Sequence, residues 1–142
     1  MVTIFVEDVG DKLEEVMDTW EQYPNVMTGE FESLSDGSYV ETDRELAEKI
    51  ENSSDYVRLP NQYEIHEYRI MKDFADTITN QRQQSRLYYA LNGRKPYRRF
   101  KDAIIDLNLE QAYYDFRADE FLKIAREWCK ENQIPYAYMR KN

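Results

Sequence analysis

A short basic segment, residues 94–101, is the stretch of the sequence whose residue types and spacing point most clearly to binding chemistry. Its five cations are Arg94, Lys95, Arg98, Arg99 and Lys101. Pro96 suits the first turn of a helix, so the cations lie at a predicted helix start, where the helix dipole disfavours positive charge. The N–H groups of a helix start and arginine side chains both bind phosphates and carboxylates. The basic segment therefore predicts a site for an anionic group.

Three interpretations of the basic segment stay open. The charges are matched inside the molecule if Arg98 or Arg99 pairs with Asp102 at helical spacing, or if the acidic first half of the chain packs against the rest. Otherwise the segment binds an external anion, or it is a solvated face without a specific partner. The residues predicted to bind an anion or a partner are Arg94, Lys95, Tyr97, Arg98, Arg99 and Lys101. The tyrosines that could stack on bases are Tyr88, Tyr89 and Tyr97.

The residues that nucleophilic or zinc chemistry requires are scarce. His66 is the only histidine and Cys129 the only cysteine. We expect His66 to be a surface or half-buried imidazole and Cys129, which follows Trp128 on the inward side of a predicted helix, to belong to the core. One His and one Cys cannot form a tetrahedral zinc site, and no glycine-rich phosphate loop is present. We therefore predict no catalytic residue, no metal site and no cofactor.

The charge is uneven along the chain. The formal net charge is −9 at pH 7, but residues 1–55 carry 16 acidic and 3 basic side chains, whereas residues 56–142 carry 12 acidic and 16 basic ones. The overall field repels polyphosphates and anionic lipids, so binding to nucleic acid would need a local patch. No apolar stretch approaches the roughly 20 residues that span a membrane, and no export signal follows Met1. We expect a cytoplasmic protein without a membrane partner.

Hydrophobic periodicity and turn residues predict a mixture of short elements in the first half of the chain. In order, they are a strand at residues 3–6, a helix from Val9 to Trp20 that ends near Tyr23-Pro24, a hairpin turn at Thr28-Gly29, a turn at Asp36-Gly37, a helix that starts with a capping box of Thr42 and Glu45, and a strand at residues 56–59 before Pro60.

The second half is predicted to be mostly helical. In order, the elements are a helix that starts at Asn61 and Glu64 and continues from Ile65 to Ile78, a helix with Leu87, Ala90 and Leu91 that ends in a left-handed cap at Asn92-Gly93, a helix from Pro96 with Tyr97, Phe100, Ile104 and Leu107 on one face, a helix over residues 109–131, and an extended tail at residues 134–138. We therefore predict an α+β fold: a helix-dominant single domain, residues 1–142, with a small antiparallel sheet mainly from the N-terminal half.

Several segments between Val9 and Ile134 are similar to one known family. They are Tyr97–Asp102 after Gly93, Tyr113–Arg117 and Ala125–Cys129, with weaker matches at Thr28–Glu30, Tyr56–Pro60 and Met71–Phe74. On these residues the sequence resembles the bacterial uncharacterised protein family zero-one-five-eight. It departs from the family at Tyr113, where Trp is frequent, and at Gln133, where Gly often follows Asn. The resemblance implies no established activity, so it supplies no catalytic residue.

These observations lead to one main functional hypothesis and two alternatives. The main hypothesis is a non-enzymatic binding or regulatory module that uses the basic segment for a protein or another anionic partner. One alternative is a weak nucleic-acid-binding protein that uses the same segment and its tyrosines. The other is an enzyme that uses carboxylates and a metal such as Mg²⁺, because hard cations need only oxygen ligands and Asp and Glu are abundant.

Overall fold

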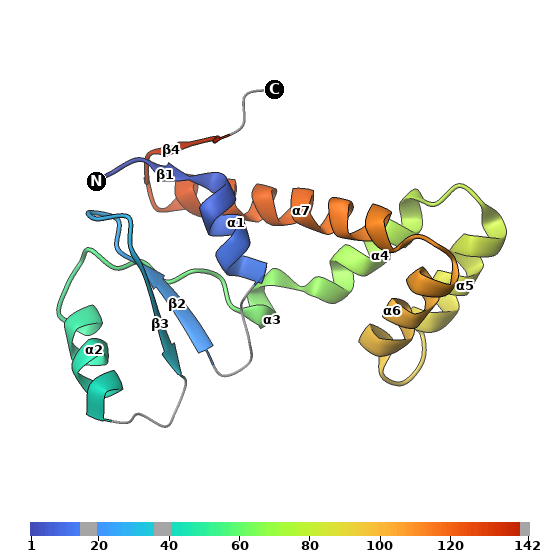
Figure 1. Ribbon diagram of the computed structural model, residues 1–142, viewed down its shortest axis with the longest axis horizontal. Coiled ribbons are helices and arrows are strands. Elements are labelled where there is room, and N and C mark those ends of the chain that lie inside the picture. Colours follow the sequence, from blue (N-terminus) through green and yellow to red (C-terminus); the bar gives the residue numbers. More distant parts are fainter. Residues whose placement is uncertain (15–19, 36–40, 140–142) are drawn as a thin grey trace. The chain divides into compact units, whose positions relative to one another are not determined.

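The computed structural model describes residues 1–14, 20–35 and 41–139 and forms two compact units (Figure 1). The terminal unit comprises Met1–Ile65 and Phe121–Asn142, and the central unit comprises His66–Glu120. Of the described residues 61% are helical, and they contain a small antiparallel sheet, which confirms the predicted helix-dominant α+β fold. The single domain predicted for the whole chain stays a prediction.

The antiparallel sheet of the terminal unit is a hairpin. β2 (Trp20–Pro24) pairs with β3 (Phe31–Ser35) along the full length of both strands. Between them Gly29 has a positive φ of 82°, a conformation that favours glycine. The Asn25 Oδ1 atom accepts hydrogen bonds from two N–H groups of the turn, at 2.9 and 3.1 Å. The hairpin predicted at Thr28-Gly29 is therefore confirmed.

The helix predicted from Val9 to Trp20 is confirmed in part. α1 comprises Val6–Glu14, whereas Trp20 belongs to β2. The expected helix end at Tyr23-Pro24 lies inside that strand, so this part of the prediction is wrong. Aromatic residues favour strands, and pairing with β3 outweighs the local helical periodicity. Two predicted features lie outside the described residues: the helical positions Val16 and Met17, and the turn at Asp36-Gly37.

The segment of residues 56–59 hydrogen-bonds with β2 but does not form the predicted strand. Of residues 56–59, Tyr56 forms an isolated antiparallel bridge with Asn25. The Val57 N–H donates to the Pro24 carbonyl oxygen at 3.1 Å. Pro24 has no N–H with which to continue a ladder toward this segment. The predicted strand is therefore wrong, although the segment still hydrogen-bonds with β2.

Two other elements of the terminal unit agree with the sequence. β1 (Ile4–Phe5) pairs in parallel with β4 (Tyr136–Ala137), so the tail predicted to be extended contains a strand. α2 (Glu41–Glu51) forms where a helix was expected from Thr42. The side chain of Thr42, and with it the predicted capping box, lies outside the described part of the chain.

His66 interrupts what the sequence predicts as one continuous helix. α3 (Gln62–Ile65) ends before it and α4 (Glu67–Thr77) begins after it, because His66 has a left-handed φ of 56°. The predicted start is confirmed as a reciprocal cap. The Asn61 Oδ1 accepts from the Glu64 N–H at 3.0 Å, and the Glu64 Oε1 accepts from the Asn61 N–H at 3.1 Å. The predicted continuation through His66 is wrong.

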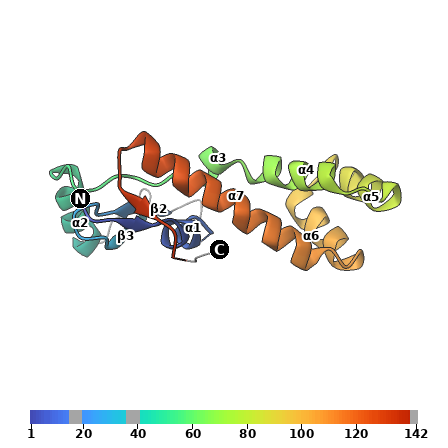
Figure 2. The same ribbon diagram turned by 90° about the horizontal axis from the view of Figure 1, so that it is seen from above.

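Helices pack side by side in the central unit. α4 contacts α5 (Gln81–Leu91), and α5 contacts α6 (Pro96–Asp106), which is drawn near α5 in Figures 1 and 2. α7 (Glu110–Glu131) begins in this unit. The three helices predicted after Asn80 are therefore confirmed, including the Pro96 start of α6.

Aromatic rings from α4, α6 and α7 form the core of the central unit. The Phe100 and Tyr113 ring centroids lie 5.0 Å apart, and the Phe74 centroid lies 5.3 Å from that of Tyr113 and 6.4 Å from that of Phe100. All three pairs meet edge to face, the arrangement that the charge distribution of the rings favours. Phe100 is 0% exposed, so its predicted place in the core is confirmed although two cations flank it in the sequence.

The Tyr113 hydroxyl lies in this core without a hydrogen-bond partner among the described residues. Tyr113 is 2% exposed, and burial, followed by the charge of Glu67, raises the pKa of its hydroxyl well above the usual value. A buried hydroxyl without a partner has lost its hydrogen bonds with water and gained none in return. The ring of Tyr113 therefore stabilises the core, whereas its hydroxyl opposes folding.

We expect Phe100→Ala to lower the free energy of unfolding by about 3–5 kcal/mol, because it leaves a cavity among packed rings. Arg98→Ala, on the same helix, is the control and should cost less than about 1 kcal/mol, because that side chain is exposed. Chemical denaturation of the two variants measures the difference. A nearly silent Phe100→Ala together with an unfolded Arg98→Ala would show that α6 faces the opposite way.

Tyr113→Phe should leave the free energy of unfolding unchanged or raise it by about 1 kcal/mol, because it removes the unpaired hydroxyl and keeps the ring. Urea unfolding of the variant and the wild type makes the comparison, with Tyr113→Leu as the control that removes the ring. A loss of more than about 1 kcal/mol in Tyr113→Phe would contradict the account, since it would mean that the hydroxyl is hydrogen-bonded in solution.

Candidate anion-binding site

The turn between α5 and α6 places the basic segment. The Asn92 N–H donates to the Tyr88 carbonyl oxygen at the end of α5, and neither Asn92 nor Gly93 is left-handed. The left-handed residue is Lys95, with a φ of 52°, directly before Pro96. The left-handed cap predicted at Asn92-Gly93 is therefore wrong. Proline disfavours the right-handed helical conformation in the residue before it, which is consistent with the change of hand falling at Lys95.

The first turn of α6 is positively charged and lacks a cap. Lys95 occupies the N-cap position and makes no side-chain hydrogen bond there. Its ammonium group has donors but no hydrogen-bond acceptor. The first turn contains no acidic residue, although Arg98 and Arg99 lie in it. Backbone N–H groups and cations therefore gather at the same helix end without an acceptor from the helix itself, an arrangement that suits an external anion.

Four of the five cations of the basic segment are open to solvent. Arg94, Lys95, Arg98 and Lys101 are exposed, and none of their side chains forms an ion pair or hydrogen bond with another described residue. The pairing of Arg98 with Asp102 that helical spacing allows does not form between these two described residues.

Arg99 is held in place differently from the other cations. Its side chain is half-buried, and its guanidinium carbon lies 4.9 Å from the centroid of the Tyr89 ring. Its Nη2 atom also donates to the Tyr89 carbonyl oxygen at 3.2 Å. The guanidinium fills the space that a β-carbon of residue 93 would occupy, so Gly93 is needed for this arrangement. The sequence suggests neither the stacking of Arg99 on Tyr89 nor the role of Gly93.

A shallow groove of about 330 Å³ lies beside this stacked pair. Its lining residues are Arg86, Tyr89, Arg99 and Asp102. The Arg86 Nη2 lies 3.3 Å from the Asp106 Oδ2, so α5 and α6 are also joined by an ion pair at this face. Sequence reasoning missed Arg86 as part of the site. The signal that could have found it is the charge of residues 77–101, which contain seven cations and no acidic side chain.

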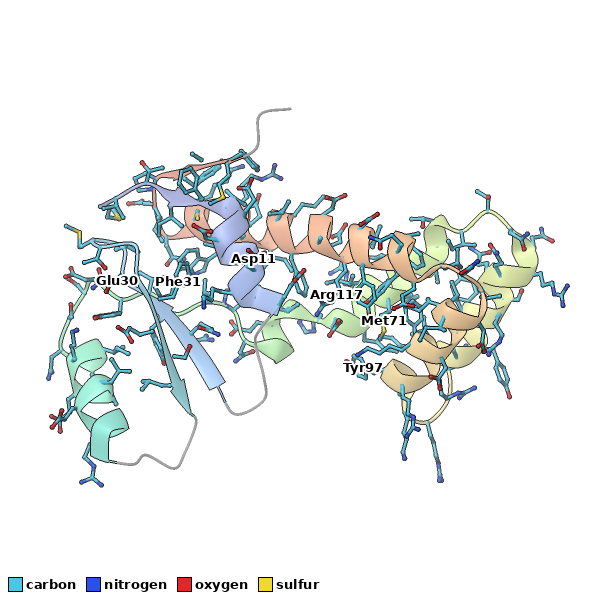
Figure 3. All side chains as sticks on the ribbon, in the orientation of Figure 1. Asp11, Glu30, Phe31, Met71, Tyr97 and Arg117 are labelled. Atoms are coloured by element: carbon cyan, nitrogen blue, oxygen red, sulfur yellow. The ribbon has the colours of Figure 1, made fainter. Side chains whose placement is uncertain are left out.

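Tyr97 lies apart from the groove, although it was predicted with the basic segment. Residues 99, 102 and 106 share one side of α6 by helical spacing, whereas residue 97 shares the other side with the core residue Phe100. Tyr97 is 45% exposed and is labelled in Figure 3. The structure thus brings Arg99 together with Tyr89, and it does not bring Tyr97 to them.

The residues considered for other chemistry occupy ordinary structural positions. His66 is exposed at the junction of α3 and α4. Cys129 is 0% exposed, which confirms its predicted place in the core, and burial raises the pKa of its thiol to about 11. Within residues 1–14, 20–35 and 41–139, no three or more His, Cys, Asp or Glu side chains gather in a way that could hold a metal ion. No helix in the same part of the chain is long and apolar enough to cross a membrane.

Comparison with known proteins places the chain in a family. The sequence model of an uncharacterised protein family (UPF0158) matches residues 7–141. Searches among curated proteins and among solved structures gave no match. The family description assigns no activity, so no residue role follows from it. The match confirms the resemblance found in the sequence. Because it covers nearly the whole chain, the chain belongs to the uncharacterised protein family UPF0158.

Proposed function

We propose that the protein is a non-enzymatic binding module that holds an anionic partner at the start of α6, through the basic segment. The observation that carries this proposal is the group of four exposed cations without a partner among the described residues, at a helix start without a cap. A positive charge close to a helix start costs about 0.3–1 kcal/mol. A bound anion would remove that cost and supply the missing hydrogen-bond acceptors.

The local charge supports this proposal more than the net charge opposes it. The chain as a whole carries −9, but the central unit, residues 66–120, holds 10 basic and 9 acidic side chains. All seven cations of residues 77–101 lie on α5, α6 or the turn between them. At physiological salt, exposed charges more than about 8 Å apart are largely screened. A partner that approaches α5, α6 and the turn between them therefore meets mainly positive charge.

The proposal extends to the setting in which the module acts. We expect it to act in the cytoplasm of a bacterium, and the acidic composition of the chain fits this expectation. The alternative of a carboxylate enzyme has no comparable support, because no cluster of metal-binding side chains forms in the described part of the chain. Binding through α6 is the function that the observed side chains favour.

Inorganic polyphosphate is a direct probe of the proposed site. We expect it to bind in isothermal titration at about 50 mM salt and to weaken steeply by about 200 mM, because phosphate contacts release counterions. The variant Arg98→Ala/Lys101→Ala should weaken binding at least about tenfold. It should also lower the slope of log affinity against log salt concentration by about two, because two phosphate contacts are lost. The matched control is Arg69→Ala/Lys72→Ala, which removes two exposed cations from α4.

Equal losses in both double variants would mean that only the total charge matters, and they would contradict a site at α6. The absence of binding by the wild type at about 50 mM salt, where electrostatic contacts are strong, would reject the proposed function.

A further inference from the structure

The Tyr89 ring presents a flat face to solvent beside the groove. Tyr89 is 71% exposed, which is unusual for so large an apolar ring. The Arg99 guanidinium covers the other face at 4.9 Å, and its hydrogen bond with the Tyr89 carbonyl oxygen fixes this geometry. The stacked arginine and the backbone of α5 thus hold the ring at the surface. An exposed ring of this kind is a platform on which a planar group can stack.

The groove beside the ring contains a carboxylate as well as two guanidinium groups. Asp102 is exposed, and its carboxylate forms no ion pair or hydrogen bond with another described residue. A carboxylate repels phosphate, so this groove is poorly suited to a phosphate alone. A carboxylate accepts hydrogen bonds from the amino groups of bases, and arginine donates to their carbonyl and ring nitrogen atoms. The lining of the groove therefore fits the edge of a base.

We infer that this groove is a base-stacking subsite, with a base on the open face of Tyr89 and the adjoining phosphates on the basic segment, which makes the partner a single-stranded nucleic acid. The inference rests on the proposed function, because the same cations hold the phosphates. A duplex hides the faces of its bases inside the stack, so it cannot use Tyr89. An acidic peptide supplies the charge but no base to stack on the ring.

The test compares two fluorescent oligonucleotides of about 12 nucleotides, a length within the usual span of single-strand sites. One has ordinary bases, and the other is abasic and keeps the same sugars and phosphates. Fluorescence anisotropy at about 50 mM salt gives both dissociation constants. We expect the wild type to bind the base-bearing strand at least about tenfold more tightly, because stacking on one aromatic side chain has an effect of this order.

Variants of Tyr89 assign that difference to the ring. Tyr89→Leu should bring the two dissociation constants together, because the base-bearing strand then has no ring on which to stack. Tyr89→Phe keeps the ring and should retain the difference. Tyr114→Leu is the matched control, because Tyr114 is an exposed tyrosine outside the groove; it should behave as the wild type does.

Equal binding of the two strands by the wild type, or an unchanged difference in Tyr89→Leu, would overturn the inference. The proposed function would survive that result as long as the abasic strand still binds through Arg98 and Lys101. A polyglutamate peptide that binds more tightly than either strand, with no effect of Tyr89→Leu, would also overturn it and identify the partner as an acidic protein. Failure of all three probes to bind would reject the proposed function itself.

Discussion

The burial of Phe100 against Phe74 and Tyr113 is the contact on which the candidate site depends, because it sets the rotation of α6 about its axis. With Phe100 fully buried, the 3.6-residue turn carries the cations at positions 98 and 101 out to solvent. Arg99 lies on the side of α6 that faces α5, where its guanidinium stacks on the ring of Tyr89. A hydrophobic contact thus decides which charges stay open and which one is held against a neighbouring helix.

Helix capping explains why the start of α6 differs from its neighbours. Asn80 caps α5 by accepting from the Gln83 N–H at 3.0 Å, and Asn61 caps α3 in the same way. α4 has no side-chain cap, but Glu67 places a negative charge in its first turn. α6 has neither a capping side chain nor an acidic first turn, and it adds cations instead. An external anion would do for α6 what Asn and Glu side chains do for the other helices.

The sequence predicts features that depend on residues close to one another. The hairpin at Gly29, the cap formed by Asn61 and Glu64, and the burial of Phe100 follow from local geometry or helical period, and all three are confirmed. Prediction from the sequence fails where a residue distant in the chain determines the local structure. Trp20 belongs to a strand because it pairs with β3, and the segment after Tyr56 is not a strand because Pro24 lacks an N–H. For the same reason the basic segment is visible in the sequence, whereas the stack of Arg99 on Tyr89 and the groove depend on contact between two helices.

Chemical-shift mapping tests the central claim, that the start of α6 is where an anion binds, more directly than an affinity does. Uniformly ¹⁵N-labelled protein would be titrated with inorganic polyphosphate at about 50 mM salt while the backbone amide resonances are followed. The account predicts that the largest shifts fall on residues 93–101, above all on the N–H groups of Tyr97 and Arg98 in the uncapped first turn. Largest shifts in the terminal unit, or none at all, would contradict it.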